Sequence, residues 1–136
     1  MLFVHRLRPR YAEVDAQGVV FNAHWLTYFD EACTRWFEAM GFNPAESFFR
    51  DFDVMIVKAV LEWQGPAGFD DPVDVAVAAA RVGTASFDVR YTATVEGRPV
   101  CVGTVTYVSV KPGTHESTPI PDALREHLDP RAIERF

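Results

Sequence analysis

The sequence predicts an α+β domain in which one long helix packs against a sheet of five strands. Two patterns lead to this prediction. Aromatic and other apolar residues recur every three or four positions from Trp25 to Met40, which is the period of an amphipathic helix. One segment before this helix and four after it, between Phe52 and Val110, have the alternation and the β-branched residues of strands. Because large rings need a broad partner surface, we expect the aromatic face of the helix to lie on the sheet.

Length and composition limit the classes of function. The 136 residues are 49% hydrophobic and 24% charged, which is typical of one globular domain over residues 1–136, with a C-terminal tail over about residues 112–136. The formal net charge is −6, so we expect no binding to nucleic acid. No apolar run approaches the roughly 18 residues of a membrane span, and the first ten residues lack a signal-peptide core. We therefore expect a cytoplasmic protein without a membrane span.

The first two elements are a short strand and the long helix. Residues 2–8 place Phe3, His5 and Leu7 on one side and Val4, Arg6 and Arg8 on the other. This pattern indicates a strand with one face on the core, and Pro9 ends this strand. The predicted buried stripe of the helix consists of Trp25, Phe29, Ala32, Trp36 and Met40, widened by Leu26, Cys33 and Phe37.

Both ends of the helix are marked in the sequence. Asn22 is a favourable N-cap residue, and Phe21 before it is placed to pack on Leu26 as a hydrophobic staple. Gly41 is a candidate for a left-handed C-cap. These signals predict a helix of about 18 residues.

Four strands follow the helix. The apolar run 52–63 predicts a long strand, and 73–81 predicts the next one. The cleanest alternation covers residues 85–96, and a tight turn over residues 96–99 leads to a last strand at 100–110. Because short turns connect the last three strands, we expect them to form an antiparallel meander.

The remaining segments give weaker signals. Phe48 and Phe49 either fold back onto the core or line a pocket, and both readings stay open. Residues 121–128 predict a short polar helix or a tail. Cys33 and Cys101 stand apart, without metal-ligand or redox spacing, so we interpret them as buried free thiols and expect no metal site.

The loop before the helix carries two carboxylates. Glu13 and Asp15 precede Gly18, and Asp15 lies seven residues before Asn22. A carboxylate is thereby brought close to a helix N-terminus, where free backbone N–H groups and the positive end of the dipole polarise an electrophilic carbonyl. This pattern is half of an acyl-transfer site. The alternative is that Glu13 and Asp15 only cap and solvate a turn.

A family resemblance adds to this reading. The run Tyr11-x-Glu13-x-Asp15-x-x-Gly18-x-Val20, followed by an aromatic-rich helix, resembles the hotdog-fold acyl-CoA thioesterases of the 4-hydroxybenzoyl-CoA thioesterase type and their Tol–Pal-associated bacterial relatives. The match extends over most of the chain, including the strand order and the tail segment STPIPD. The resemblance implies a five-stranded antiparallel sheet wrapped around one long helix. It also implies hydrolysis of an acyl-CoA, with coenzyme A as part of the substrate and no other cofactor. Edge-to-edge homodimers that share active sites are implied as well, and homotetramers are common.

The resemblance also implies roles for single residues. Asp15 falls on the catalytic carboxylate, acting as nucleophile or as general base, and Gly18 and Val19 of the same loop are candidate substrate-binding residues. The backbone N–H of Asn22 falls on the donor to the thioester oxygen. Relatives usually have His or Tyr at this position and Asn two residues later, whereas this chain has Asn22 and then His24. A backbone role survives that exchange, and for His24 both substrate contact and helix capping stay open.

A second group of candidate residues lies at a later turn. Arg81, Thr84 and Ser86 bracket Gly83, and the resemblance implies that this turn and the strand after it bind the pantetheine and the nucleotide of coenzyme A. The alternative is a solvated turn. Relatives often carry Arg just before the S-T-P-I-P segment, where this chain has Glu116.

Two other functions remain as alternatives. One is an acyl-CoA-binding module on the same fold without turnover, and the presence of both Asp15 and Gly18 argues against it. The other is an enoyl-CoA hydratase or dehydratase, which would use a His with an acidic partner. The sequence does not indicate which acyl group is bound.

Overall fold

The computed structural model describes residues 2–43 and 52–131, and the predicted α+β architecture is confirmed within them. The segment with Phe48 and Phe49 lies outside the described residues. The elements in chain order are β1 (Phe3–Leu7), the 3-10 turn η1 (Tyr11–Glu13), α1 (His24–Ala39), β2 (Asp53–Trp63), β3 (Val73–Val82), β4 (Ser86–Val95), β5 (Arg98–Val110) and α2 (Asp122–Arg125).

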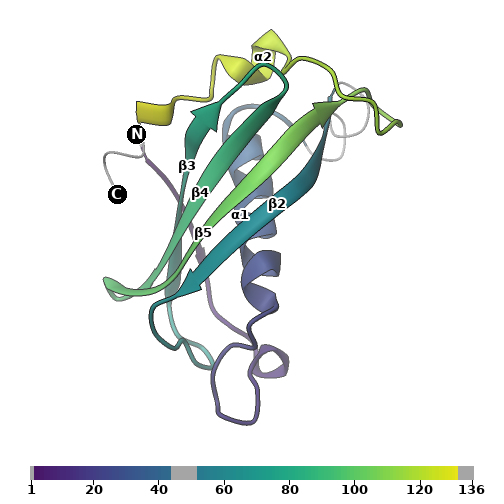
Figure 1. The fold of residues 1–136 in the computed structure, drawn as a ribbon. Coiled ribbons are helices and arrows are strands. Elements are labelled where there is room, and N and C mark those ends of the chain that lie inside the picture. The colour runs from purple at the N-terminus through teal and green to yellow at the C-terminus, as the bar shows by residue number, and fades with distance from the viewer. Residues whose placement is uncertain (1, 44–51, 132–136) are drawn as a thin grey trace.

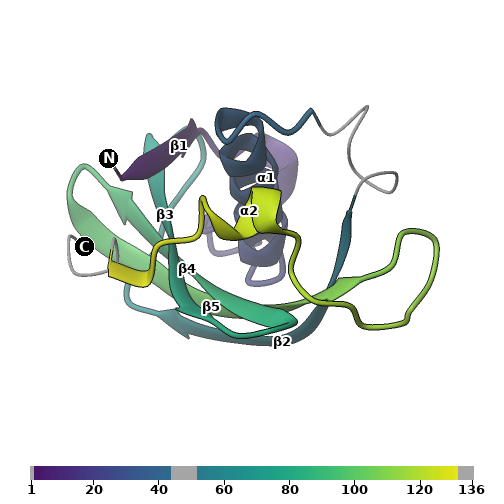
Figure 2. The ribbon, with the colours of Figure 1, turned by 90° about the horizontal axis from the view of Figure 1, so that it is seen from above.

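The five strands form one antiparallel sheet in the order β1-β3-β4-β5-β2. The predicted meander of β3, β4 and β5 is confirmed, and β2 and β1 lie at the two edges. Figure 1 shows the strands running diagonally in front of α1, and in Figure 2 the sheet curves around the helix. The β4–β5 turn is shorter than predicted, because Glu96 and Gly97 both have positive φ (49° and 81°). These values allow a two-residue hairpin turn, and Arg98 and Pro99 belong to β5.

The aromatic face of α1 packs into the concave side of the sheet. Phe29 is 1% exposed and its ring stacks on Tyr91 of β4, with centroids 4.9 Å apart and an angle of 9°. The predicted stripe is confirmed for six residues, which are Trp25, Phe29, Ala32, Cys33, Trp36 and Phe37. It is wrong for Leu26, which is 42% exposed, and it omitted Tyr28, which is 4% exposed. The buried surface is therefore rotated from Leu26 toward Tyr28.

The start of α1 differs from the prediction. The helix begins at His24 after Ala23, and no side chain caps it, so Asn22 is not the side-chain N-cap. The backbone closes the first turn instead, because the His24 N–H donates to the Phe21 carbonyl at 3.0 Å. The half-exposed Phe21 ring meets the His24 ring edge-on at 6.0 Å, and Leu26, its predicted staple partner, is 42% exposed.

The end of α1 agrees with the prediction. Gly41 has a φ of 100°, and its N–H donates to the Glu38 carbonyl at 2.9 Å. The Phe42 N–H donates to the Phe37 carbonyl at 3.0 Å. This pair of bonds is a Schellman motif, which favours glycine at the left-handed position.

The C-terminal tail closes one end of the core. In Figure 2, α2 and the segments beside it lie across the end of α1. The prediction of a polar helix is wrong for the inner face of this segment, because Ile120, Leu124 and Leu128 are at most 7% exposed. Three apolar residues at spacings of four anchor the tail on the core.

Candidate active site

A tight loop carries Asp15 at one end of the fold, below α1 in Figure 1. Val14 pairs with Val20, and the Asp15 N–H donates to the Val19 carbonyl at 2.8 Å. The Gly18 N–H donates back to the Asp15 carbonyl at 2.9 Å, and Gly18 has a φ of 78°. Glycine is favoured there because side chains rarely adopt this conformation, so Gly18 shapes the loop that presents Asp15.

The two carboxylate oxygens of Asp15 have different environments. Oδ1 accepts hydrogen bonds from the backbone N–H groups of Gln17 at 2.8 Å and Val19 at 3.4 Å. Oδ2 accepts no hydrogen bond from any residue that the structure describes. The alternative role of capping a turn is therefore real, but it uses one oxygen and leaves the other for a reaction.

The helix N-terminus offers free donors near this loop. His24 and Trp25 donate their N–H groups to the carbonyls of Phe21 and Asn22. Within residues 2–43 and 52–131, the N–H groups of Asn22 and Ala23 donate to no protein acceptor. An N–H of this kind at the positive end of a helix can stabilise an oxyanion, which is the role predicted for the backbone of Asn22.

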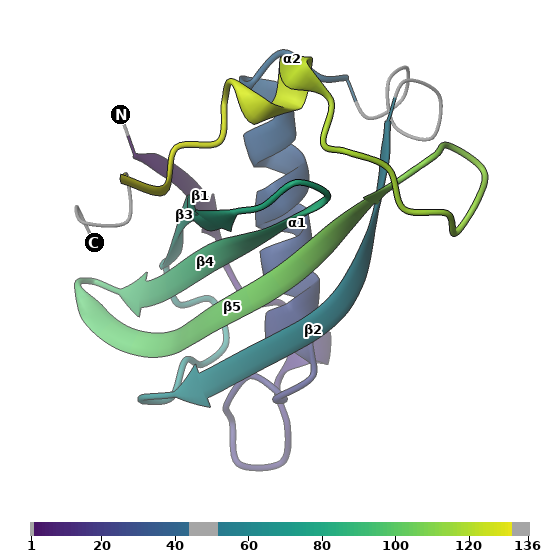
Figure 3. The ribbon, with the colours of Figure 1, turned by 45° about the horizontal axis from the view of Figure 1, so that its top comes forward.

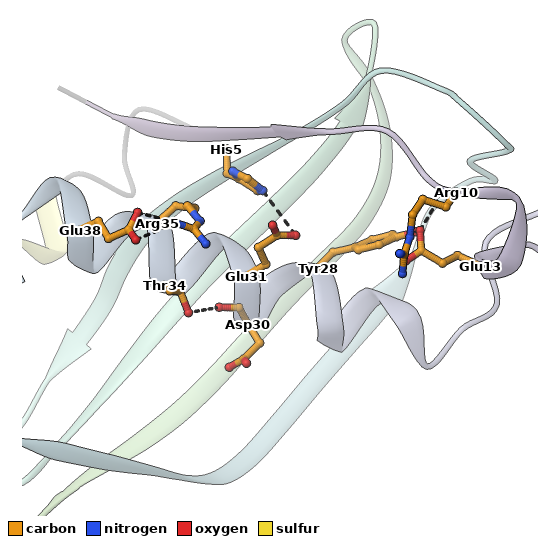
Figure 4. Close-up of polar contacts among 9 residues, drawn as sticks. All are labelled: His5, Arg10, Glu13, Tyr28, Asp30, Glu31, Thr34, Arg35 and Glu38. Atoms are coloured by element: carbon orange, nitrogen blue, oxygen red, sulfur yellow. Dashed lines mark hydrogen bonds and ion pairs between the residues drawn. The ribbon is translucent and has the colours of Figure 1, made fainter. Parts of the chain in front are cut away.

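Glu13 connects the loop to the helix. Its buried Oε1 accepts from the Tyr28 hydroxyl at 2.9 Å and from the Arg10 N–H at 2.7 Å (Figure 4). The Glu13 carbonyl accepts from the Phe21 N–H at 2.9 Å. Burial alone would raise the pKa of Glu13, but the hydrogen bonds from Arg10 and Tyr28 lower it overall. Burial and the adjacent Glu13 raise the pKa of Tyr28, which keeps its proton. The sequence did not reveal Tyr28, because only the helix rotation turns it toward Glu13.

A small cavity lies between α1 and the sheet, beside β2. It has a volume of about 110 Å³, and its lining residues are Leu26, Phe29, Asp30, Ile56, Ala59, Val105 and Tyr107. Asp30 is the one charged residue of this lining, and partial burial raises its pKa. Asp30 lies outside the predicted buried stripe of the helix, and the sequence did not reveal this position. The half-exposed Leu26 is explained too, since it lines the cavity and not the core.

Both cysteines are buried free thiols, as predicted. Burial raises the pKa of Cys33 to about 11 and that of Cys101 to about 12. Next to Cys33, the hydroxyls of Tyr91 and Tyr107 form a hydrogen bond at 2.5 Å. These thiols are therefore packed, protonated and unsuited to nucleophilic attack.

The second group of predicted residues gathers at the turn between β3 and β4. The Arg81 guanidinium donates to both carboxylate oxygens of Asp88, at 3.0 and 3.1 Å, and to the Ser86 hydroxyl at 2.9 Å. The carbonyl of Thr84 accepts from the Ile120 N–H at 2.9 Å and from the Arg125 guanidinium at 3.0 Å. Arg81 and Ser86 are thus brought together, with Thr84 fixed beside them by the tail.

One copy of the chain does not bring the two groups together. Ser86 pairs with Val108 at the upper end of the sheet, whereas the Asp15 loop bonds to Ala67 and Gly68, which follow the lower end of β2 (Figure 3). The 16 residues of α1 separate these ends by roughly 24 Å. Among the described residues, no three His, Cys, Asp or Glu side chains are grouped to hold a metal ion, and no helix is long and apolar enough to cross a membrane. Glu116 pairs with Lys111 at 3.1 Å.

Comparisons with known proteins identify the superfamily and the fold. A family model described as the thioesterase-like superfamily matches residues 9–128. A 1,4-dihydroxy-2-naphthoyl-CoA hydrolase from Synechococcus elongatus is 28% identical over 122 residues, which cover 88% of this chain and 89% of that protein. The solved structure of a gentisyl-coenzyme A thioesterase has a TM-score of 0.82 and 25% identity, covering 91% of this chain and 97% of its own. A thioesterase superfamily structure from Jannaschia has the same fold, with a TM-score of 0.86 at 21% identity, covering 95% of this chain and 92% of its own.

These matches confirm the predicted hotdog fold and, at the level of the superfamily, the resemblance to acyl-CoA thioesterases. The narrower assignments, to the 4-hydroxybenzoyl-CoA thioesterase type and to Tol–Pal-associated relatives, stay predictions.

Proposed function

Because this chain belongs to the thioesterase-like superfamily, we propose that it hydrolyses an acyl-CoA thioester to a free acid and coenzyme A. The observation that carries the proposal is the arrangement of Asp15. Its Oδ1 accepts from two backbone N–H groups, and the described part of the chain offers no donor to its Oδ2. The loop is bonded through Glu13 to the start of α1, where the Asn22 N–H has no acceptor among the same residues. Asp15 Oδ2 and the Asn22 N–H are the two groups that we propose to act on one thioester carbonyl.

The chemistry follows from these two groups. The thioester oxygen accepts a hydrogen bond from the Asn22 N–H, which stabilises the negative charge that develops on this oxygen. Asp15 Oδ2 then acts by one of two routes. In the first it attacks the carbonyl carbon, displaces the thiolate and forms an anhydride that water cleaves. In the second it takes a proton from a water molecule that attacks the carbonyl, and the thiolate leaves and is protonated. Both routes consume one water molecule.

We assign the acyl group to the cavity between α1 and β2. Its volume of about 110 Å³ suits a small ring, and the Asp30 carboxylate is the one charged acceptor in an otherwise largely apolar lining. A ring hydroxyl would donate to this carboxylate. The relatives named for gentisyl-CoA and 1,4-dihydroxy-2-naphthoyl-CoA act on hydroxylated aromatic acyl groups, and the same substrate class fits this cavity.

The active protein is a homodimer or homotetramer that forms through β2. This edge strand exposes five large apolar side chains, which are Met55, Ile56, Val57, Val60 and Trp63. The other edge strand, β1, carries the exposed Arg6 and is followed by Arg8 and Pro9, which block edge pairing. Antiparallel pairing of two β2 strands about a two-fold axis brings the lower end of one copy beside the upper end of the other. The Asp15 loop of one copy then shares a site with Arg81, Thr84 and Ser86 of the second copy.

The deciding experiment measures free-thiol release from a panel of acyl-CoA esters. Asp15→Asn keeps the shape of the side chain but removes the reacting group, so we expect kcat to fall at least 100-fold with the fold unchanged. Asp70→Asn is a matched control, because Asp70 is an exposed loop carboxylate with a φ of 62° that asparagine tolerates. Its kcat should stay within about twofold of the parent value.

Three results would contradict the proposal. Unchanged turnover in Asp15→Asn would remove Asp15 from the site. Binding of acyl-CoA without thiol release would favour the binding module, and hydration of an enoyl-CoA without thiol release would favour a hydratase.

A further inference from the structure

A buried hydrogen bond between Tyr28 and Glu13 lies beside the Asp15 loop and outside the reacting groups. Glu13 precedes Asp15 by two residues and its side chain is 10% exposed. We propose that Tyr28 and Glu13 are positioning residues, which hold the Asp15 loop at a fixed place relative to the N-terminus of α1. This inference rests on the proposed function, because it explains how Asp15 is aimed at a thioester.

Tyr28 provides the link between two separate elements. Arg10 also binds Glu13, but it lies in the same loop three residues away and its side chain is 80% exposed. The Arg10 contacts therefore hold the loop to itself. The Tyr28 hydroxyl reaches Glu13 from one turn inside α1, at 2.9 Å, and is buried. In Figure 4 the Tyr28 ring extends from the helix to the Glu13 carboxylate.

The backbone of Glu13 completes the connection. Its carbonyl accepts the Phe21 N–H at 2.9 Å, and Phe21 directly precedes Asn22, the predicted oxyanion donor. One residue thus sets the loop against both the side chain of Tyr28 and the chain that enters the helix. Because a displacement of about 1 Å at a reacting group can cost about 100-fold in rate, loosening Glu13 should act on turnover.

The chemical states of the pair suit this role. Tyr28 remains protonated and Glu13 remains ionised at neutral pH, because the pKa of Tyr28 is raised and that of Glu13 is lowered. The result is a charge-assisted hydrogen bond in a buried place, which is stronger than a bond between neutral groups. Neither side chain is among the groups that contact the thioester in the proposed mechanism, so their effect must pass through Asp15.

The test is Tyr28→Phe, with Tyr91→Phe as the matched control. Both changes remove a buried tyrosine hydroxyl with a hydrogen-bond partner, so both should lower the melting temperature. We expect Tyr28→Phe to lower kcat about tenfold or more with KM within about twofold, because the substrate contacts remain. Tyr91→Phe should keep kcat within about twofold. Equal kcat values for Tyr28→Phe and the parent would overturn the inference, while the loss in Asp15→Asn would still support the proposed function.

A double variant shows whether Tyr28 acts through Asp15. In an Asp15→Asn background there is no reacting carboxylate to position, so adding Tyr28→Phe should change the residual kcat by less than about twofold. A further tenfold loss would show that Tyr28 acts independently of Asp15 and would overturn the inference. If Tyr28→Phe does not fold, Glu13→Gln replaces it, since glutamine keeps the shape and one acceptor oxygen but loses the charge. A kcat below about one half of the parent value supports the inference, and an unchanged kcat overturns it.

Discussion

The ring of Phe29 lies so close to Gly103 that a β-carbon added at Gly103 would be 2.6 Å from Cε2 of the ring. Phe29 is the centre of the buried face of α1, and Gly103 lies in the middle of β5, opposite Tyr91 of β4. The same ring stacks on Tyr91 at 4.9 Å. The missing side chain at Gly103 therefore sets how deeply the helix sits in the curved sheet.

The first prediction concerns this contact. Gly103→Ala should destabilise the protein by about 1–3 kcal/mol, because a methyl group must displace either the ring or the strand. The free energy of unfolding is measured with urea. In a Phe29→Leu background the same change should cost less, because the ring atoms that clash are absent. Equal costs in both backgrounds would show that the ring does not define this distance.

The sequence was sufficient to predict the buried face of an element where that element has its own periodic pattern of apolar residues. In β4, Phe87, Val89, Tyr91 and Ala93 are all 0% exposed, as their alternation predicted, because a strand with one buried face repeats every two residues. The aromatic stripe of α1 was predicted for the same reason. Gly41 was identified correctly because a left-handed cap has a residue-level signature.

The sequence was insufficient to predict the surroundings of a residue or strand where these depend on a segment that is distant in the chain. The run 52–63 predicted a strand, but its place at a sheet edge follows from pairing with β5. Asp30 faces a cavity because β2 stands opposite that part of α1, and Leu124 is buried because the tail returns over the core. Asn22 is a residue type that is favoured at the N-cap. However, α1 begins at His24 after a backbone turn, and the Asn22 side chain does not cap it.

The second prediction concerns assembly. Light scattering should give a mass of two or four times 15.3 kDa at micromolar concentration, since the exposed apolar edge of β2 needs a partner. Val60→Lys places a charge on this edge and should shift the mass toward that of a monomer. Val4→Lys, at a 40% exposed position on β1, is the matched control and should leave the mass unchanged. A monomeric parent protein would refute the shared site.

The third prediction concerns stability at acid pH. Burial raises the pKa of Asp88, but hydrogen bonds from Arg81 and Thr106 lower it overall. A carboxylate with a lowered folded pKa contributes stability that is complete above its unfolded value, near 4, and is lost as pH falls through the folded value. Asp88→Asn should therefore destabilise the protein at pH 7 and much less at pH 2.5, as measured by urea unfolding. Asp74→Asn, which breaks an exposed pair with Arg6, should change stability little at pH 7.

The fourth prediction concerns the acyl group. If Asp30 accepts a hydrogen bond from a ring hydroxyl, the parent protein should prefer hydroxybenzoyl-CoA over benzoyl-CoA in kcat/KM. Asp30→Asn should reduce that preference by about tenfold or more, because a charged acceptor contributes about 1.5–3 kcal/mol. Glu31→Gln is the matched control, since Glu31 is adjacent in sequence but faces His5 of β1. An unchanged preference in Asp30→Asn would place the ring elsewhere.

The last prediction separates the backbone of Asn22 from its side chain. The Asn22 side chain caps nothing and is exposed, so Asn22→Ala should change the free energy of unfolding by less than about 0.5 kcal/mol. The backbone N–H remains in this variant, and kcat should fall by no more than about tenfold. Asn22→Pro removes the N–H itself, and because this N–H donates to no acceptor in residues 2–43 and 52–131, its loss removes none of the hydrogen bonds found there. Its kcat should fall by about 100-fold to 1,000-fold, the effect of losing one oxyanion donor.

Ala23→Pro is the matched control for the proline. Ala23 has a φ of −67°, which proline adopts without strain, and its N–H is the neighbouring donor that also has no acceptor among the described residues. We expect kcat in Ala23→Pro to stay within about tenfold of the parent value, with folding confirmed by circular dichroism. A large loss in Ala23→Pro with a small loss in Asn22→Pro would move the oxyanion donor by one residue. A large loss in Asn22→Ala would instead assign the thioester contact to the side chain, because that substitution leaves every backbone donor in place.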